Sequence, residues 1–367
     1  MTNKPLIGAA VIGQSGGPSS VINASAYGAI KTALESEAIT RVLGARHGIK
    51  GVLDDDLIDM GKEDPAELAH MKYTPSSALG SCRYKIADPD ADDTDFKRIL
   101  EIFKKYNVRY FFYNGGNDSM DTCSKISRYC AKVGYECRVM GVPKTIDNDL
   151  YGTDHCPGFA SAAKYIATSF MEVSRDCHVY DVGMVTIIEC MGRHAGWLTA
   201  AASLANLKGD GPDLIYLPEV DFDMDQFIAD VKRVYAEKKN CLVAVSEGVH
   251  YADGSFVSEA KTSGTDIQES FNSGKVAVES ALAGVTGKMV GFKCDRKDGY
   301  KCEYVLFDLG DVANTEQKVP LAWITPEHNG VTQDFIDYCL PLIQGETKQA
   351  KEDGLPAFVH LKKVFAE

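Results

Sequence analysis

The sequence contains no run of about 18 uninterrupted apolar residues, the length that a membrane-crossing helix requires. Its first residues lack the charged segment followed by a long apolar run that marks a secretory signal. Basic residues are outnumbered, 39 against 52 acidic ones, and the formal net charge of −13 argues against nucleic acid as the main partner. These absences predict a cytoplasmic protein that binds neither membrane nor nucleic acid.

Cysteine pairs spaced as CxxC are also missing. The eleven cysteines are scattered along 367 residues, so their spacing argues against a structural zinc site. An odd number of scattered cysteines is typical of a reducing compartment, in which most thiols are buried as small hydrophobic groups.

Two familiar nucleotide-binding motifs are absent as well. The sequence has no GxGxxG fingerprint of dinucleotide-binding proteins and no GxxxxGK[ST] motif of P-loop enzymes. Each glycine–lysine pair is followed by a residue other than serine or threonine. The common Rossmann and Walker types of nucleotide site are therefore disfavoured.

What the sequence does contain is a regular alternation of short apolar runs with stretches of helical periodicity. Apolar residues make up 45% and charged residues 25%, as in globular proteins with sizeable cores. The length suggests two domains or one large two-lobed unit. The alternation predicts an α/β fold with parallel sheets flanked by helices. Strands are expected at residues 7–12, 42–45, 108–113, 138–142, 185–190, 214–217 and 242–246, and helices at 19–34, 96–106, 120–133, 159–175, 197–207 and 224–237.

Four polar or glycine-rich turns follow predicted strands. They span residues 13–18, 114–119, 143–149 and 191–196. In parallel sheets, ligands bind beyond the carboxyl ends of the strands. We therefore expect the functional residues in these turns.

The segment Pro143–Asp149, with the sequence PKTIDND, carries the most specific chemistry. Asp147 and Asp149 are two residues apart, and Lys144 lies three residues before the first of them. In phosphoryl transfer, one carboxylate can accept a hydroxyl proton, another can hold a metal ion, and a lysine can neutralise phosphate charge. A polar turn that caps the next helix is the alternative interpretation.

Other candidate residues lie in turns of less specific sequence. The glycine turns Gly13–Pro18 and Gly115–Ser119 could present backbone amides to an anion, or they could be tight packing turns. Arg83 and Arg193 could contact phosphate, or Arg193 could form a surface ion pair. Glu247 ends an apolar strand, where it could accept sugar hydroxyls or lie in solvent.

Taken in order, these motifs resemble the phosphofructokinase family. The resemblance covers most of the chain up to about residue 250. It implies two α/β lobes with the active site between them, magnesium as cofactor, and transfer of a phosphoryl group to the 1-hydroxyl of fructose 6-phosphate in glycolysis. The matching segments are Gly16-Gly17, Leu79–Arg83, Gly115–Ser119, Pro143–Asp149, Met191–Arg193 and Ser246-Glu247.

The resemblance also implies a role for each matching residue. Asp147 would take the proton from the sugar hydroxyl, and Asn117 and Asp149 would hold magnesium. Catalysis would also use Lys144, Thr145 and Arg193. The phosphate donor would contact Gly16, Gly17, Arg83, Asn117, Asp118 and Lys144, and the sugar phosphate would contact Thr145, Asp147, Met191, Gly192, Arg193 and Glu247.

Two positions resemble the pyrophosphate-dependent branch of the family. ATP-dependent members have glycine at the positions of Asp118 and Lys144. The side chain and charge of Asp118 should exclude a nucleotide, while Lys144 can supply a positive charge to the smaller donor, pyrophosphate. The implied reaction is reversible and gives fructose 1,6-bisphosphate and phosphate.

The sequence departs from the family pattern at three places. Asn117 stands where many members have a metal-binding aspartate, and its amide brings no charge. Family members usually have arginines after Glu247 that clamp the sugar 6-phosphate, but residues 248–266 contain none, as if several tens of residues were absent. Met184 stands where ATP-dependent members have an arginine that reaches a neighbouring subunit. The basic residues within 293–301 could replace the clamp, or they could form a solvated hairpin.

Three functional hypotheses therefore stay open. The first is a pyrophosphate-dependent phosphofructokinase. The second is an enzyme that uses ATP or another acceptor, such as sedoheptulose 7-phosphate. The third is a catalytically weak paralogue that lacks the 6-phosphate clamp.

For the domains, we expect a donor-binding lobe and a sugar-phosphate lobe. The donor lobe would comprise residues 1–160 and part of 265–310, and the sugar-phosphate lobe would comprise residues 161–264 and 311–367. The resemblance implies a homodimer or homotetramer.

Overall fold

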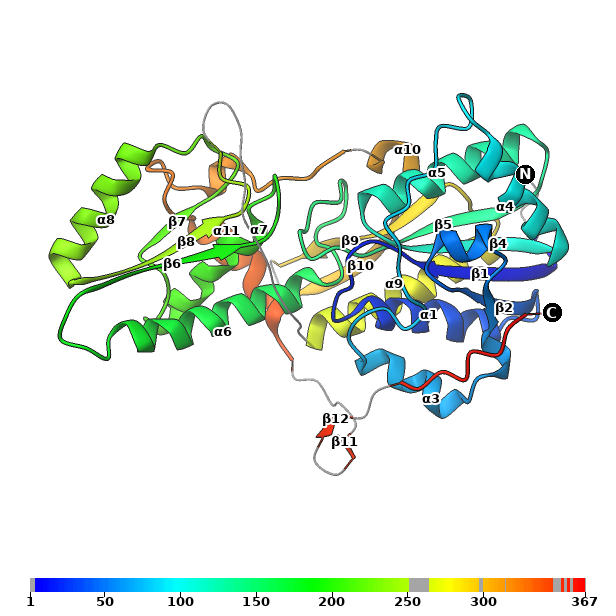
Figure 1. Cartoon of the computed structure of the whole chain (residues 1–367), viewed down its shortest axis with the longest axis horizontal. Coiled ribbons are helices and arrows are strands. Elements are labelled where there is room, and N and C mark those ends of the chain that lie inside the picture. The colour runs from blue at the N-terminus through cyan, green and yellow to red at the C-terminus, as the bar shows by residue number, and fades with distance from the viewer. Residues whose placement is uncertain are drawn as a thin grey trace.

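The computed structural model describes residues 4–250, 264–296, 300–313, 315–345, 351–352, 355–356 and 359–366. Its strands form a seven-stranded sheet, a three-stranded sheet and a two-stranded hairpin, and Figure 1 shows the two larger sheets in separate lobes. The strands are β1 (Gly8–Gln14), β2 (Ile39–Ala45), β3 (Leu57–Asp59), β4 (Val108–Gly115), β5 (Arg138–Pro143), β6 (Met184–Cys190), β7 (Leu214–Tyr216), β8 (Asn240–Ser246), β9 (Lys288–Asp295), β10 (Lys301–Asp308), β11 (Lys351–Glu352) and β12 (Leu355–Pro356). The α-helices are α1 (Ile22–Leu34), α2 (Ile49–Leu53), α3 (Pro65–His70), α4 (Thr94–Lys105), α5 (Asn117–Lys132), α6 (Phe159–Cys177), α7 (Trp197–Ala201), α8 (Met224–Lys238), α9 (Gly264–Leu282), α10 (Leu309–Val312) and α11 (Gln333–Cys339).

The seven-stranded sheet has the order β10-β9-β5-β4-β1-β2-β3. Its central strands β1, β2, β4 and β5 are mutually parallel, and β9 joins β5 in the same direction. Every residue of β1 and β5 is buried, as expected for parallel strands covered on both faces. One face packs against α4 and α5, and the other packs against α1 and α9.

Helices α1 and α9 lie unusually close together. A β-carbon added at Gly28 would come within 2.2 Å of the Phe271 carbonyl oxygen, and one at Gly274 would come within 2.1 Å of the Ser25 carbonyl oxygen. The two backbones touch because both contact positions are glycines. This contact attaches α9 to the first lobe although it follows the second lobe in sequence.

The three-stranded sheet has the order β6-β8-β7, with all strands parallel. Helices α6 and α7 pack on one face and α8 packs on the other. Along β6 the side chains alternate between half-buried and exposed, and Val185 and Ile187 are 44% and 52% exposed. Among the described residues, β6 is an edge strand whose exposed row consists of Val185, Ile187 and Glu189.

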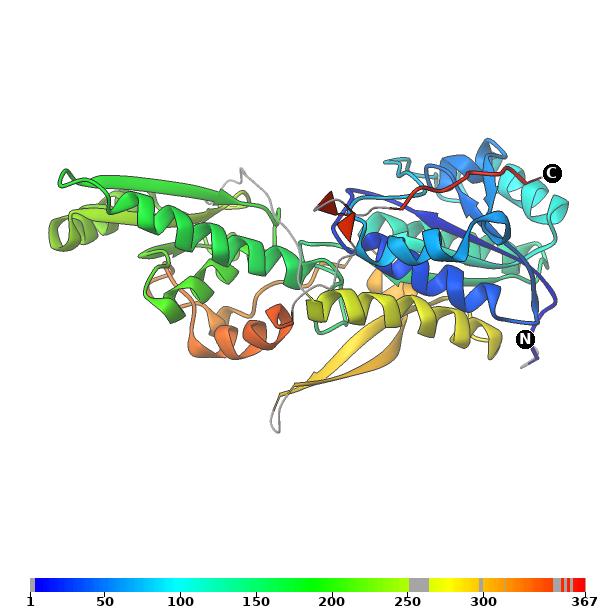
Figure 2. The ribbon, with the colours of Figure 1, turned by 90° about the horizontal axis from the view of Figure 1, so that it is seen from below.

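The hairpin of β9 and β10 extends beyond α9 at its far end (Figure 2). Cys294 and Cys302 are direct partners across this antiparallel pair. Lys297, one of the basic residues that could replace the 6-phosphate clamp, lies outside the described residues.

The last described residues return to the first lobe. The Val364 carbonyl accepts a hydrogen bond from the Asp59 amide, and the Ala366 amide donates to the Leu57 carbonyl. Residues 364–366 therefore lie along the outer edge strand β3, and the amides before them donate to Glu63, Glu67 and Thr74 of the same lobe (Figure 1). The sequence led us to group residues 359–366 with the sugar-phosphate lobe. The backbone of residues 364–366 completes the hydrogen bonding of a sheet edge, which no side-chain pattern reveals. The other domain bounds stay a prediction.

Most of the expected elements are present. The thirteen expected segments all correspond to elements of the structure, although the helix expected at 197–207 ends at Ala201 and continues as a 3-10 turn. Helices α2, α3, α9, α10 and α11 were not expected. No helix in the described part of the chain has the length and apolar character needed to span a bilayer.

Candidate active site

The carboxyl ends of β1, β4 and β5 bring three of the expected turns together. Asn114, at the end of β4, donates from its side chain to the carbonyls of Val142 and Pro143 on β5. The Lys144 amide donates in turn to the Gly115 carbonyl. The end of one strand is thus fixed against the next, as expected for a site built on a parallel sheet.

Gly16 makes room for Lys144. The Lys144 ammonium lies 3.1 Å from the place where a Gly16 β-carbon would be, and Gly16 has a φ of +78°. A side chain there would be strained and would press on the ammonium. On the next residue, a Gly17 β-carbon would lie 3.8 Å from the Arg83 guanidinium, so the first glycine turn lies beside two cations.

Lys144 is buried beside two carboxylates. Lys144 is only 5% exposed to solvent. Burial lowers the pKa of Lys144 to about 8, while the charges of Asp147 and Asp149 oppose that shift. The site therefore holds a cation with little solvation of its own, ready to contact an anionic ligand.

Asp147 is a buried carboxylate with a raised affinity for protons. Burial raises the pKa of Asp147 to about 6, and repulsion by Asp149 adds to this shift. The backbone amide of Asp147 donates to Thr145 Oγ1 over 3.1 Å, which fixes the turn. Arg193 approaches from the other lobe, with its Nε 3.9 Å from Asp147 Oδ2.

Asn148 orients the two aspartates and was missed by the sequence analysis. Its φ of +59° lies in the left-handed region, which asparagine tolerates better than most residues. Its side chain donates to the Tyr338 hydroxyl and accepts from the Cys156 amide, each at 2.7 Å. In the sequence, the only indication of this role was the position of Asn148 between two aspartates.

The second aspartate has a polar neighbour on α5. Asn117 Nδ2 donates to Asp149 Oδ2 over 2.9 Å. Asn117 Oδ1 is buried and has no hydrogen-bond partner within the described part of the chain. Burial raises the pKa of Asp149 as well. An unsatisfied amide oxygen beside a carboxylate is a donor set that fits Mg²⁺, because this ion prefers oxygen ligands.

The turn after β6 lies across from these residues. Glu247, at the end of β8, accepts hydrogen bonds through Oε1 from the amides of Gly192 at 2.7 Å and Arg193 at 2.6 Å. Gly192 and Arg193 have positive φ angles of 141° and 53°. Glu247 thus fixes a strained turn that presents Arg193 to Asp147. The neighbouring Met191 is half-buried against the core of the second lobe.

Asp118 has a partner that the sequence analysis did not anticipate. Lys85 Nζ lies 2.8 Å from Asp118 Oδ1, and both side chains are mostly exposed. This ion pair reduces the negative charge that Asp118 presents to a phosphate donor. The expected exclusion of a nucleotide by Asp118 stays a prediction, and this ion pair favours an effect of side-chain volume over one of charge.

Comparison with known proteins gives one family. The family model described as Phosphofructokinase matches residues 9–290. This chain belongs to the phosphofructokinase family.

Individual members of this family match over nearly their whole length. The chain is 38% identical to a pyrophosphate–fructose 6-phosphate 1-phosphotransferase of Halomonas elongata, covering 95% of each chain. It is 39% identical to the protein of that name from Xanthomonas campestris, covering 99% of this chain and 97% of the other. A crystal structure of a pyrophosphate-dependent phosphofructokinase from Nitrosospira multiformis superimposes with a TM-score of 0.92, at 38% identity and 98% coverage of both chains.

The alignments also show that this family member is short. The alignment with the Xanthomonas protein runs over 413 positions, whereas this chain has 367 residues, so at least 46 positions have no residue here. The expected gap after Glu247 stays a prediction, and residues 251–263 lie outside the described residues.

Proposed function

We propose that this protein transfers a phosphoryl group from pyrophosphate to the 1-hydroxyl of fructose 6-phosphate, in either direction. The observation that carries this proposal is the meeting of Asp147 and Arg193 across the two lobes, with Lys144 and Asp149 beside them. The set contains a base, two cations for phosphate and a carboxylate for a metal. The names of the full-length relatives support the same substrates.

In the proposed reaction, Asp147 takes the proton of the sugar 1-hydroxyl. The oxygen then attacks one phosphorus of pyrophosphate, the bridging P–O bond breaks, and phosphate leaves. With a pKa of about 6, Asp147 is a stronger base than an ordinary carboxylate, and it is still ionised near neutral pH. Lys144 and Arg193 would neutralise the charge on the transferred group.

Asn117 and Asp149 would hold magnesium. Bound magnesium neutralises negative charge on the phosphate oxygens. The unsatisfied Asn117 oxygen and the buried Asp149 carboxylate are the groups of this chain that support the assignment. We propose further that Gly16, Gly17, Arg83 and Asp118 border the donor. The sugar phosphate would contact the turn of Met191 and Gly192 and the side chain of Glu247.

Among the described residues, fewer basic side chains are free to bind the 6-phosphate of the sugar than to bind the phosphate donor. Arg296 binds both oxygens of Asp154, at 2.7 and 2.8 Å, and also donates to the Tyr338 carbonyl, so its guanidinium is already engaged. Lys293 and Lys301 are exposed on the hairpin. We therefore propose weak binding of fructose 6-phosphate and ordinary binding of pyrophosphate.

The direct test is an assay with fructose 6-phosphate and magnesium, with pyrophosphate or ATP as donor. We expect turnover with pyrophosphate only, with a high KM for the sugar phosphate. Turnover with ATP alone would overturn the donor assignment. A folded sample that turns over neither fructose 6-phosphate nor sedoheptulose 7-phosphate would contradict the proposed function and favour a paralogue that only binds ligands.

We also propose a cytoplasmic homodimer or homotetramer. All eleven cysteines are free thiols in the structure, as in a reducing compartment. The exposed apolar side chains of Val185 and Ile187 on the edge strand β6 support self-association, because such edges are usually covered.

A further inference from the structure

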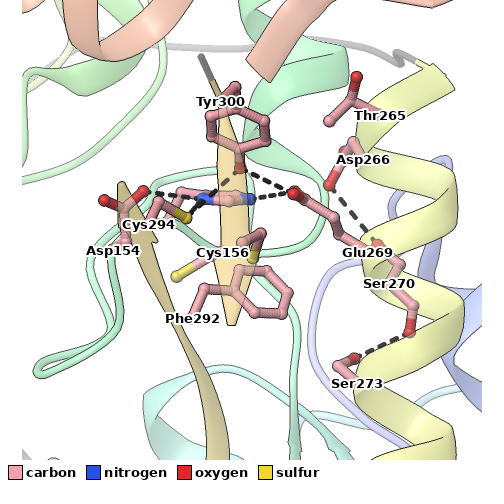
Figure 3. Close-up of polar contacts among 12 residues, drawn as sticks. Asp154, Cys156, Thr265, Asp266, Glu269, Ser270, Ser273, Phe292, Cys294 and Tyr300 are labelled. Carbon is pink, nitrogen blue, oxygen red and sulfur yellow. Dashed lines mark hydrogen bonds and ion pairs between the residues drawn. The ribbon is translucent and has the colours of Figure 1, made fainter. Parts of the chain in front are cut away.

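A second cluster of reactive side chains lies apart from the phosphate-binding groups. Asp154, His155 and Cys294 each offer a possible metal-ligating atom, and these atoms all lie within 4.8 Å of one another. His155 Nδ1 is 2.9 Å from Asp154 Oδ1 and 3.8 Å from Cys294 Sγ. Figure 3 shows Asp154 and Cys294 together at the end of β9, opposite Glu269 of α9.

The other ring nitrogen of His155 is held by a carboxylate. Nε2 lies 2.5 Å from Glu269 Oε2, and the Tyr300 hydroxyl donates to Glu269 Oε1 over 2.7 Å. If Nε2 carries the proton and donates to Glu269, the lone pair of Nδ1 points toward Asp154 and Cys294. Metal-binding histidines are typically oriented by such a carboxylate on the opposite nitrogen.

A second thiol is available from the neighbouring strand. Cys302 on β10 is the direct antiparallel partner of Cys294 on β9. Direct partners project to the same face of a sheet, with β-carbons about 4.5–5.5 Å apart. Both cysteines are half-buried free thiols. The Cys302 thiol already hydrogen-bonds to the Cys294 sulfur, so the two sulfurs lie side by side.

We propose that Asp154, His155, Cys294 and Cys302 form a site for a zinc-type divalent ion, with Glu269 as the residue that orients His155. Zinc binds nitrogen, oxygen and thiolate ligands at about 2.0–2.3 Å in tetrahedral geometry. Two ligands of one such ion are therefore separated by roughly 3.3–3.8 Å. The 2.9 and 3.8 Å separations at His155 lie near this range, so small side-chain shifts suffice.

The charges of the cluster also suit a divalent ion. The two thiolates and the carboxylates of Asp154 and Glu269 carry four negative charges. The ion and the Arg296 guanidinium carry three positive charges, so the occupied cluster keeps one excess negative charge. Each carboxylate oxygen has two lone-pair sites, so Asp154 can bind Arg296 and an ion together. Thiolate and imidazole ligands favour zinc over magnesium.

The proposed site would brace the active-site segment. Asp154 is five residues beyond Asp149, and its carbonyl accepts from the Tyr338 hydroxyl over 2.7 Å. Tyr338 also contacts Asn148, which orients the catalytic aspartates. A bound ion would therefore link this segment to β9 and β10 and stabilise the fold, without itself contacting substrate.

The test is titration of the reduced full-length protein with Co²⁺ and Zn²⁺ in excess Mg²⁺, which occupies oxygen-only sites. Co²⁺ bound to thiolate gives a near-ultraviolet charge-transfer band, and tetrahedral Co²⁺ gives intense visible bands. We expect one equivalent of Co²⁺ with both signals, displaced by Zn²⁺. We expect Cys294→Ser to reduce the intensity of the thiolate band, because only the Cys302 thiolate is left, and to weaken binding at least tenfold, while Cys82→Ser, at a half-buried cysteine elsewhere, leaves both signals unchanged.

A second variant separates a metal site from a packed polar cluster. Glu269→Gln keeps the shape of the side chain, and loss of an orienting carboxylate typically lowers metal affinity about 10- to 100-fold. Binding that is unchanged in this variant and in Cys294→Ser would overturn the site. It would also be overturned if the reduced protein gives no thiolate band, or if Cys294 and Cys302 prove to form a disulfide that mass spectrometry detects in place of a bound ion.

Discussion

At the residue scale, Asp147 is the side chain on which the proposed chemistry depends most. We expect Asp147→Ser to lower turnover by roughly 10²–10⁴-fold, the range for loss of a general base, with little change in donor binding. Steady-state kinetics with pyrophosphate would measure both. The control is Asp90→Ser, because Asp90 is an exposed carboxylate paired with Lys132. Equal losses of turnover and of donor affinity would show that Asp147 is structural.

The choice of donor is tested at Asp118 and Lys144. We expect the double variant Asp118→Gly with Lys144→Gly to gain some ATP use and to lose pyrophosphate use. Because Lys85 pairs with Asp118, we expect Asp118→Asn, which keeps the volume and removes the charge, to go on excluding ATP. Kinetics with each donor would distinguish the two effects. ATP use by the Asp118→Asn variant would mean that charge excludes the nucleotide, and an unchanged donor preference in the double variant would refute both assignments.

The roles of the candidate site residues stay predictions, but their proximity in the structure was easier to predict from the sequence than their surroundings. Lys144, Asp147 and Asp149 lie within one heptapeptide, so local spacing was sufficient to find them. Lys85 and Tyr338 act through contacts with residues that are distant in sequence or on another element, and no spacing rule reports those contacts. The proposed zinc-type ligands come from two segments about 140 residues apart. A search for closely spaced CxxC pairs therefore could not find them.

At the element scale, the contact between α1 and α9 depends on two glycines, Gly28 and Gly274, that bring the helix backbones together. We expect Gly274→Ala to lower stability by roughly 1–3 kcal/mol, because the added methyl group would press on the Ser25 carbonyl. The matched control is Gly310→Ala in α10, where an added β-carbon meets nothing within 4 Å. The urea midpoint of unfolding should fall for the first variant and stay or rise for the second. Equal midpoints would show that the helices can move apart without cost.

Helix α9 also shows where element prediction from sequence fails. The strands β1, β4 and β5 were predictable because each is a short apolar run buried on both faces. In α9, polar residues such as Asp266 and Ser270 are buried, while Gln268, Lys275 and Glu279 are exposed, so polar residues occupy both faces and blur the helical pattern. Those side chains hydrogen-bond to the start of α6 and to each other. The hydrophobic pattern of the sequence does not indicate such contacts.

At the scale of the whole molecule, the exposed apolar side chains on β6 predict self-association. We expect Ile187→Lys to reduce the molar mass of the particle measured by light scattering after size-exclusion chromatography. Val133→Lys is the matched control, because Val133 is 43% exposed at the end of α5 in the other lobe. An unchanged mass in the Ile187→Lys variant, or a monomeric parent protein, would remove β6 from the interface.

The first lobe draws its strands from both ends of the polypeptide. β9 and β10 extend the sheet beyond β5, and residues 364–366 complete its opposite margin at β3. A ribosome delivers these pieces well after β1 to β5 have been synthesised. Until then the early strands have two open margins that could pair with other nascent chains. The sheet that carries Lys144 and Asp147 therefore cannot be completed until residues far along the chain from β1 to β5 have been synthesised.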